Sequence, residues 1–181
     1  MGFLVSSDYS SQIRAEVKTI ITGNSATIQL DAELKAQALM ESYLRHRYKV
    51  AEVFIDIPAH NMLVAYVVND EVYYTDGGVV YTYLAIQAGT GHLPTDTAYW
   101  KKGDKRDKHL VKLYVDIVLY NLHCSNNART IPEHIDDAYS EALKWLEWVA
   151  QGKISAGLPL LTDDTGNPFK HGGIPQTGHH W

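Results

Sequence analysis

Three polar side chains in the second half of the chain recur at a spacing that could support chemistry. Asp116, Tyr120 and His123 follow one another at helical intervals, so a carboxylate, a phenol and an imidazole would share one helix face. Such a set could move a proton between neighbouring groups. A polar stripe on the surface of a helical bundle explains the same spacing without any reaction. We therefore assign no catalytic role to these residues.

The other candidates for chemistry are the histidines near the C-terminus, His171, His179 and His180. Imidazoles can bind a metal ion, but an extended tail lacks the surrounding groups that hold metal ligands in place. The sequence contains no phosphate-binding loop, nucleophile elbow, HExxH or CxxC motif. We expect no metal site, no cofactor and no enzymatic activity.

Length and composition indicate one globular domain with a small insertion. Of the 181 residues, 45% are hydrophobic and 20% are charged, and the net charge is −5. No basic patch occurs, which argues against primary binding to a nucleic-acid backbone. The single cysteine, Cys124, fits a reducing compartment. The first residues lack the basic region and apolar stretch of a signal peptide. We expect assembly in a cytoplasm, without membrane contact.

The most regular patterning begins at Lys105 and predicts a helix that continues to Cys124. Its polar residues gather into one narrow stripe and nearly all the others are large and apolar, which is typical of a helix at the centre of a bundle. Leu119 lies on the polar stripe. Asn121 lies opposite it and should be buried with a hydrogen-bond partner.

A second helix follows directly and is predicted to end at Gly152. Its start has the spacing of a capping box, formed by Thr130 and Glu133, with Pro132 in the first turn. Trp148 lies off the apolar stripe of this helix. An exposed tryptophan favours an interface, although burial under a loop or under the tail would explain it equally well.

The N-terminal third is predicted to contain a loose segment and two helices. Residues 1–8 read as the loose lead-in. A short helix ends at Gly23 and has an apolar stripe that should be buried, made of Ile13, Val17, Ile20 and Ile21. The next helix is expected to start at Asp31, as its N-cap, and to run to about Tyr48.

Residues 51–103 change character and predict a small β module. β-branched and aromatic residues form three runs, at 52–57, 63–68 and 71–86, and Asp76-Gly77-Gly78 marks a hairpin turn within the third. Aromatic side chains expected to be exposed on this module are Tyr73, Tyr74, Tyr81 and Trp100.

Residues 156–181 predict an extended C-terminal tail with spaced apolar anchors. Together with Trp148, the candidate contacts to neighbouring subunits or partners are Leu158, Leu160, Phe169 and Trp181. The fold class is therefore mainly α: an antiparallel bundle of about four helices from residues 1–50 and 104–155, with the β module inserted between its second and third helices.

Three sequence blocks, in this order, resemble the Mu-type phage head–tail connector, or neck adaptor, proteins. They are ESYLRHRYKV, LVKLYVDIVLYNLH and YSEALKWLEWVAQGKI. The phrases that carry the resemblance are Tyr43-Leu44-Arg45, Asp116-Ile117 with Tyr120, and Ala150 with Gly152-Lys153. The resemblance spans the four helices, roughly half of the chain. Simple members of that family have a short loop where this chain has residues 51–103.

The β module is itself similar to small carbohydrate-binding modules of the chitin-binding kind. It shares a Tyr66-x-x-Asn69-Asp70-x-Val72 phrase, a Gly78-x-x-Tyr81 strand and Pro94 leading to Trp100. Asn69 replaces the usual glycine, and His60-Asn61-Met62 stands where a leading tryptophan is expected. The resemblance implies that the fold is kept and that sugar binding is weakened or lost.

The connector resemblance implies a structural virion protein at the head–tail interface. Such proteins form a ring, commonly of about twelve copies, which docks on the portal protein and on neighbouring neck or tail proteins. Genomic DNA passes through the ring without sequence-specific binding. Two alternatives remain: a glycan-binding decoration protein that acts through the β module, and a small helical enzyme or regulatory protein.

Overall fold

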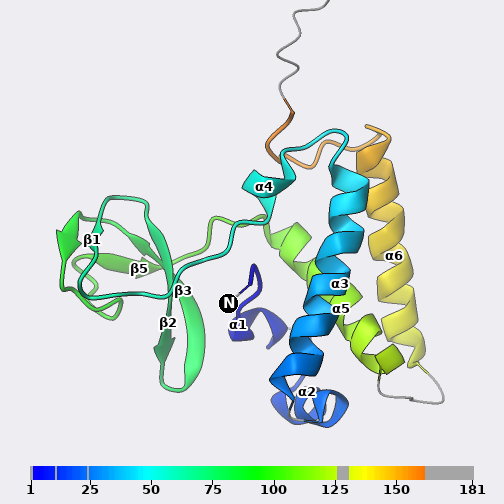
Figure 1. Cartoon of the computed structure of the whole chain (residues 1–181), viewed down its shortest axis with the longest axis horizontal. Coiled ribbons are helices and arrows are strands. Elements are labelled where there is room, and N and C mark those ends of the chain that lie inside the picture. Colours follow the sequence, from blue (N-terminus) through cyan, green and yellow to red (C-terminus); the bar gives the residue numbers. More distant parts are fainter. Residues whose placement is uncertain (1, 11, 24, 126–130, 162–181) are drawn as a thin grey trace, which may run out of the picture.

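The computed structural model describes residues 2–10, 12–23, 25–125 and 131–161, and Figure 1 shows its strands to one side of its helices. The helices are α1 (Ser6–Tyr9), α2 (Ala15–Thr22), α3 (Ala26–Leu44), α4 (Val50–Val53), α5 (Lys108–Ser125) and α6 (Glu133–Ala150). The strands are β1 (Ala65–Tyr66), β2 (Glu71–Asp76), β3 (Val79–Ala85), β4 (Gly89–Thr90) and β5 (Trp100–Lys102). The fold is mainly α with small antiparallel sheets between α4 and α5, which confirms the predicted fold class.

Helix α5 lies at the centre of the bundle, as its patterning predicts. It packs against α3 and α6, and it runs antiparallel to both (Figure 1). Fully buried side chains come from all three helices, for example Met40 of α3, Ile117 of α5 and Leu146 of α6. Each such side chain stabilises the fold by about 1.5–3 kcal/mol relative to an exposed one.

The polar stripe of α5 faces solvent as expected at Lys108, His109 and Lys112, but it is covered at Asp116 and His123. Asp116 is 7% exposed, His123 is 9% exposed, and Leu119 is buried beside them. Both polar side chains find a partner one turn away in the same helix. Lys112 Nζ lies 2.8 Å from Asp116 Oδ2, and His123 Nδ1 lies 2.8 Å from the carbonyl oxygen of Leu119. Because Asp116 and His123 each have a hydrogen-bond partner within α5, both side chains can be buried without losing that bond.

The first residues are part of the core, so the prediction of a loose lead-in is wrong. Phe3 is buried together with Leu4 and Val5, and its ring stacks on Tyr114 and meets Phe54 edge to face. Three consecutive apolar residues are too few to show a helical or strand period. All three are nevertheless almost completely buried.

Helix α3 begins earlier than the sequence suggests, at Ala26, because Ser25 caps it. The Oγ atom of Ser25 accepts a hydrogen bond from the backbone N–H of Ile28. Asp31 is therefore inside the helix, where its carboxylate pairs with Lys35 at 2.6 Å. The helix also ends earlier than expected, at Leu44.

The short helix α2 ends where predicted, since Gly23 adopts a left-handed conformation with φ of 57°. Its apolar stripe is only partly covered. Ile21 is buried, whereas Val17 is exposed and Ile20 is 71% exposed. The prediction that this stripe is buried is wrong for those two residues.

The hairpin between β2 and β3 is confirmed. Gly77 and Gly78 connect the strands with φ values of 59° and 83°, the positive values that a tight two-residue turn requires. Strand β5 pairs with β3, and β1 with β4 forms a separate two-stranded sheet. The run 52–57 is no strand: it supplies α4 and an irregular segment, because Val53 and Phe54 are buried in the helical core.

Helix α6 has the predicted length and end. Gly152 follows it with φ of 73°, and Pro132 is its N-cap rather than a residue of its first turn. Thr130, the other half of the expected capping box, lies outside the described residues. Trp148 is off the apolar stripe, as expected, and is 37% exposed.

Candidate functional site

The three residues considered for a proton relay do not act as one group. Asp116 pairs with Lys112, and His123 contacts the backbone of its own helix. The ring of Tyr120 stacks on Tyr139 of α6, with ring centroids 3.8 Å apart. Each side chain thus has a separate partner. Over the described ranges, no three histidine, cysteine or carboxylate side chains gather as a metal ion would require.

Asn121 has a hydrogen-bond partner, as the sequence predicts. Its side chain is half-buried and donates a hydrogen bond of 3.3 Å to the carbonyl oxygen of Ala32 in α3. The bond joins the two helices that contribute most to the core, so the role of Asn121 is structural.

A buried ion-pair network joins the N-terminal segment to the start of α5. The guanidinium of Arg106, whose side chain is 5% exposed, donates to both carboxylate oxygens of Asp8 at 2.7 and 3.0 Å. It also donates to Asp104 at 2.6 and 2.9 Å and to the carbonyl oxygen of Phe3. One cation thus fixes the chain entering α5 against α1, which lies between the strands and the bundle (Figure 1).

Electrostatics within this network favour the ionised forms. Burial alone would raise the pKa of the Asp104 carboxyl, but hydrogen bonds from Arg106 and Lys108 lower that pKa to about 2. Burial likewise disfavours the charged guanidinium, yet the two carboxylates raise the pKa of Arg106 above its ordinary value. Sequence reasoning missed this network, because Asp8 and Arg106 are far apart in the chain.

A cleft of about 690 Å³ lies next to this network, between β3, β5, α1 and α5. Three lysines line or border it, and each is paired with a carboxylate at 2.8–3.2 Å: Lys102 with Asp76, Lys108 with Asp104, and Lys112 with Asp116. Because each lysine has a counter-charge, the cleft offers no excess charge for a ligand.

The aromatic residues of the β module form its core rather than an exposed set. Trp100 is 3% exposed, so the prediction that it is exposed is wrong; its indole N–H donates to the carbonyl oxygen of His92. His60 occupies the region where the leading tryptophan is expected. It stacks on Tyr66 and meets Trp100 edge to face.

The three candidate tyrosines of the module are half-buried. Tyr74 and Tyr81 pack against the Trp100 core, and Tyr73 belongs to the same β2–β3 hairpin. The ammonium group of Lys102 lies 3.8 Å from the centre of the Tyr81 ring and covers one of its faces. Sugar binding requires an open ring face, so this arrangement does not favour a glycan site.

The interface candidates occupy different positions on the helical bundle. Trp148 lies on the outside of α6, with Lys144 Nζ 5.0 Å from its ring. Leu158 packs against the core, whereas Leu160 is exposed. Phe169 and Trp181 lie outside the described residues.

Residues 158–161 cross the end of the bundle and are held there by backbone hydrogen bonds. Lys49 N–H donates to the carbonyl oxygen of Pro159, and Leu161 N–H donates to that of Arg47, both at 2.9 Å. Tyr48 and Leu160 form an isolated antiparallel bridge between these bonds. We call residues 158–161 the strap.

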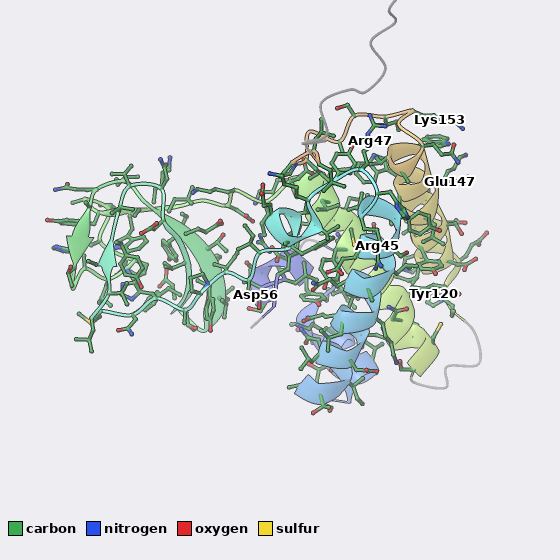
Figure 2. The ribbon with its side chains drawn as sticks, turned by 45° about the horizontal axis from the view of Figure 1, so that its top comes forward. Arg45, Arg47, Asp56, Tyr120, Glu147 and Lys153 are labelled. Atoms are coloured by element: carbon green, nitrogen blue, oxygen red, sulfur yellow. The ribbon has the colours of Figure 1, made fainter. Side chains whose placement is uncertain are left out.

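The strap lies at a basic end of the bundle. Arg45 and Arg47 follow α3, Lys153 follows α6, and Figure 2 shows the three side chains near the C-terminal ends of these helices. The phrases Tyr43-Leu44-Arg45 and Gly152-Lys153, distant in the sequence, therefore lie at the same end of the molecule.

None of the described helices is long and apolar enough to cross a bilayer. No curated protein and no solved structure matches the chain. Residues 105–170, which contain α5, α6 and the strap, match the family described as Bacteriophage Mu, Gp36. The match begins after the β module and gives no support to a carbohydrate-binding module. The C-terminal part of the chain, including the central helix of its bundle, is therefore similar to the Bacteriophage Mu, Gp36 family.

Proposed function

We propose that this chain is a structural protein of a tailed phage and forms a ring in the neck of the virion, between the portal and the tail. The observation that carries the proposal is the match of residues 105–170 to the Bacteriophage Mu, Gp36 family. The matched region supplies the most completely buried helix of the fold, so the similarity concerns the body of the protein.

The physical properties of the bundle support this role. A ring subunit needs a rigid body, and α5 is enclosed by α3, α6 and the N-terminal residues. It also needs outward side chains for contacts with other subunits, which Trp148 and Leu160 provide. Residues 1–50 and 104–155 would form the ring body in this proposal, and the strap would lead residues 162–181 towards an adjacent protein.

The net negative charge of the chain suits a channel through which DNA passes better than a surface that binds DNA. The chain has a net charge of −5, and a lumen with excess carboxylates repels phosphate. DNA would then slide through the ring without being held. The ring would contain about twelve copies and would assemble in the host cytoplasm before it joins the virion.

The proposal is tested by measuring the mass of the purified chain, first alone and then mixed with portal complexes from the same virus. We expect a ring in at least one of these conditions, because a portal can template subunits that are monomeric in isolation. A monomer that fails to bind portals would contradict the neck assignment.

A glycan-binding decoration protein is the alternative function. It would require exposed aromatic rings on the β module, whereas Trp100 is buried and Tyr81 is covered on one face by Lys102. A glycan array measures this possibility directly, and we expect no sugar-dependent signal.

A further inference from the structure

The β module ends in a short segment that exposes aliphatic side chains. Residues 62–68 contain β1 and parts of the two turns that flank it, and within them only Tyr66 is buried. The exposed fraction is 89% for Leu63, 60% for Val67 and 52% for Val68. Figure 1 shows β1 at the end of the module that points away from the helices. We call residues 62–68 the module tip.

The module tip is held in a fixed shape by hydrogen bonds to its backbone. Asn61 Oδ1 accepts one from the N–H of Leu63 at 2.9 Å. Asp70 Oδ2 accepts one from the N–H of Val67 at 2.8 Å. Each of the two turns is also closed by a backbone hydrogen bond. Turns usually carry glycine, proline, asparagine or aspartate, whereas these two display aliphatic side chains on a rigid frame. The tip is therefore preorganised for a contact.

The module tip and the strand beside it lack ionic side chains. Residues 57–69 and 77–95 contain no lysine, arginine, aspartate or glutamate, and the second range includes β4, which pairs with β1. Asp70, which follows the first range, is engaged with the backbone of the tip. A charged side chain pressed against such a surface would lose water without gaining a counter-ion. An uncharged apolar partner therefore fits, and the outside of α6, with five exposed carboxylates and one lysine, does not.

A segment of suitable composition follows the strap in the same chain. Residues 171–181 contain no lysine, arginine, aspartate or glutamate, and they include the large apolar side chains of Ile174 and Trp181. Pro175 restricts Ile174 to extended backbone, which lowers the entropy lost on binding. Residues 162–181 can span up to about 70 Å when extended. This reach is more than twice the length of α3, which is about 28 Å.

We propose that residues 171–181 of one copy bind the module tip of the next copy. Trp181 and Ile174 would pack on the aliphatic side chains of the tip, as apolar anchors do at the centre of an interface. The strap fixes the exit of the chain at the C-terminal ends of α3 and α6, whereas the tip points away from the bundle (Figure 1), which favours a second copy over the same one. A segment that binds a different surface makes a head-to-tail contact, the kind that closes a ring. The proposal rests on the ring of the proposed function and names a contact within it.

Two other occupants would cover the same side chains. Pairing of two module tips would give a two-fold dimer that does not grow, and it would leave residues 171–181 without a surface. Binding of the tip by the C-terminal segment of its own copy would add no contact between subunits. The three arrangements give different cross-links, so one experiment separates them.

Cross-linking of the full-length chain is that experiment. Thr90→Cys places a thiol beside the tip, because Thr90 is exposed and pairs with Ala65 of β1, and Gln176→Cys places one in the C-terminal segment. Both are made in a Cys124→Ser background and treated with a short bis-maleimide, alone and with portal complexes. With one variant carrying a mass tag, we expect the 90–176 product between copies to exceed the 90–90 and 176–176 products. Ala38→Cys, exposed on α3, replaces Thr90→Cys as the control and should give little product.

Substitutions on either side of the contact should lower the 90–176 yield. Leu63→Ser or Trp181→Ala, added to the cysteine variants, should reduce it at least about tenfold, as loss of a central apolar anchor does. Leu34→Ser is the matched control, because Leu34 is 58% exposed on α3 and should leave the yield unchanged. Circular dichroism verifies that each variant remains folded.

A dominant 90–90 product would overturn the proposal in favour of paired tips. In a chain with both cysteines, a 90–176 product that an excess of cysteine-free chain does not reduce would overturn it in favour of the copy's own segment. A 90–176 yield no higher than the 38–176 yield in both conditions would overturn it outright. The neck assignment fails separately: a chain that cross-links as expected but ignores portal complexes keeps this contact and loses the proposed location.

Discussion

The guanidinium of Arg47 lies directly over Gly152. A β-carbon added at Gly152 would clash with Nη1 of Arg47, and Gly152 has a φ of 73°. The end of α3 and the end of α6 therefore meet at a residue that has no side chain. Residues 153–157 lead from this point to the strap, where the N–H of Leu161 donates to the carbonyl oxygen of Arg47.

Gly152→Ala should destabilise the protein by about 1–2 kcal/mol, because residues with a β-carbon are strained at positive φ. Gly157→Ala is the matched control, since Gly157 has a φ of 65° but no neighbouring atom within 4 Å of its β-carbon position. Urea denaturation measures both. We expect similar losses, because the Arg47 side chain can swing aside, and a much larger loss for Gly152→Ala would show that Arg47 is held rigidly.

Arg106→Met should cost about 3–5 kcal/mol of unfolding free energy, since it removes the guanidinium from the buried carboxylate of Asp8 and leaves Asp104 with Lys108 alone. Lys35→Ala removes an exposed pair and should cost only about 0.3–0.5 kcal/mol. Both are measured by urea denaturation at neutral pH. Adding Asp8→Asn and Asp104→Asn to Arg106→Met should recover part of the loss. A cost for Arg106→Met as small as that for Lys35→Ala would contradict a structural role for the network.

Stability should depend on pH through Asp104. The pKa of this carboxyl is lowered from 3.8 to about 2 in the folded protein, so its ionised form favours folding. This contribution, about 2 kcal/mol, is fully present above about pH 4 and is lost as the pH falls towards 2.

Asp104→Asn should therefore flatten the decline of stability between about pH 4 and 2, as measured by urea midpoints across that range. Asp31→Asn is the control, because Asp31 belongs to an exposed pair. If the urea midpoints of Asp104→Asn fall with pH in parallel with those of the unsubstituted chain, other carboxylates are responsible for the loss of stability in acid.

Leu119→Asp should prevent folding as completely as Val115→Asp. Both positions are buried on α5, and an unpaired buried charge costs several kcal/mol. Leu34→Asp is the matched control, because Leu34 is exposed on α3 and should change stability by only about 0.5 kcal/mol. Far-UV circular dichroism distinguishes the two outcomes. A folded Leu119→Asp protein would contradict the burial of Leu119 in the helical core.

Patterning within short stretches predicted the parts of the fold that local interactions determine. The apolar period of α5, the stripe of α6 and the Gly77-Gly78 turn each act over a few residues, so the sequence alone is enough to find them. The start of α3 was misplaced because Ser25 and Asp31 are both good caps, and only the chain around them decides between the two.

Long-range contacts account for what the sequence could not predict. Phe3 is buried because Phe54 and Tyr114, from distant segments, surround it. The Arg106 network joins residues from opposite halves of the chain. The exposure of Ile20 was also unpredictable, because an amphipathic pattern indicates which face prefers to be covered and not whether the same chain covers it.

The strap determines how a mechanical load would enter the molecule. Tension on the chain beyond Leu161 acts first on two backbone hydrogen bonds, from Lys49 to Pro159 and from Leu161 to Arg47. These bonds pass the load to the turn that follows α3, so α6 is bypassed although it immediately precedes the strap in sequence. The contact between α3 and the central helix α5 thus lies in the direct path of any force transmitted through Leu161.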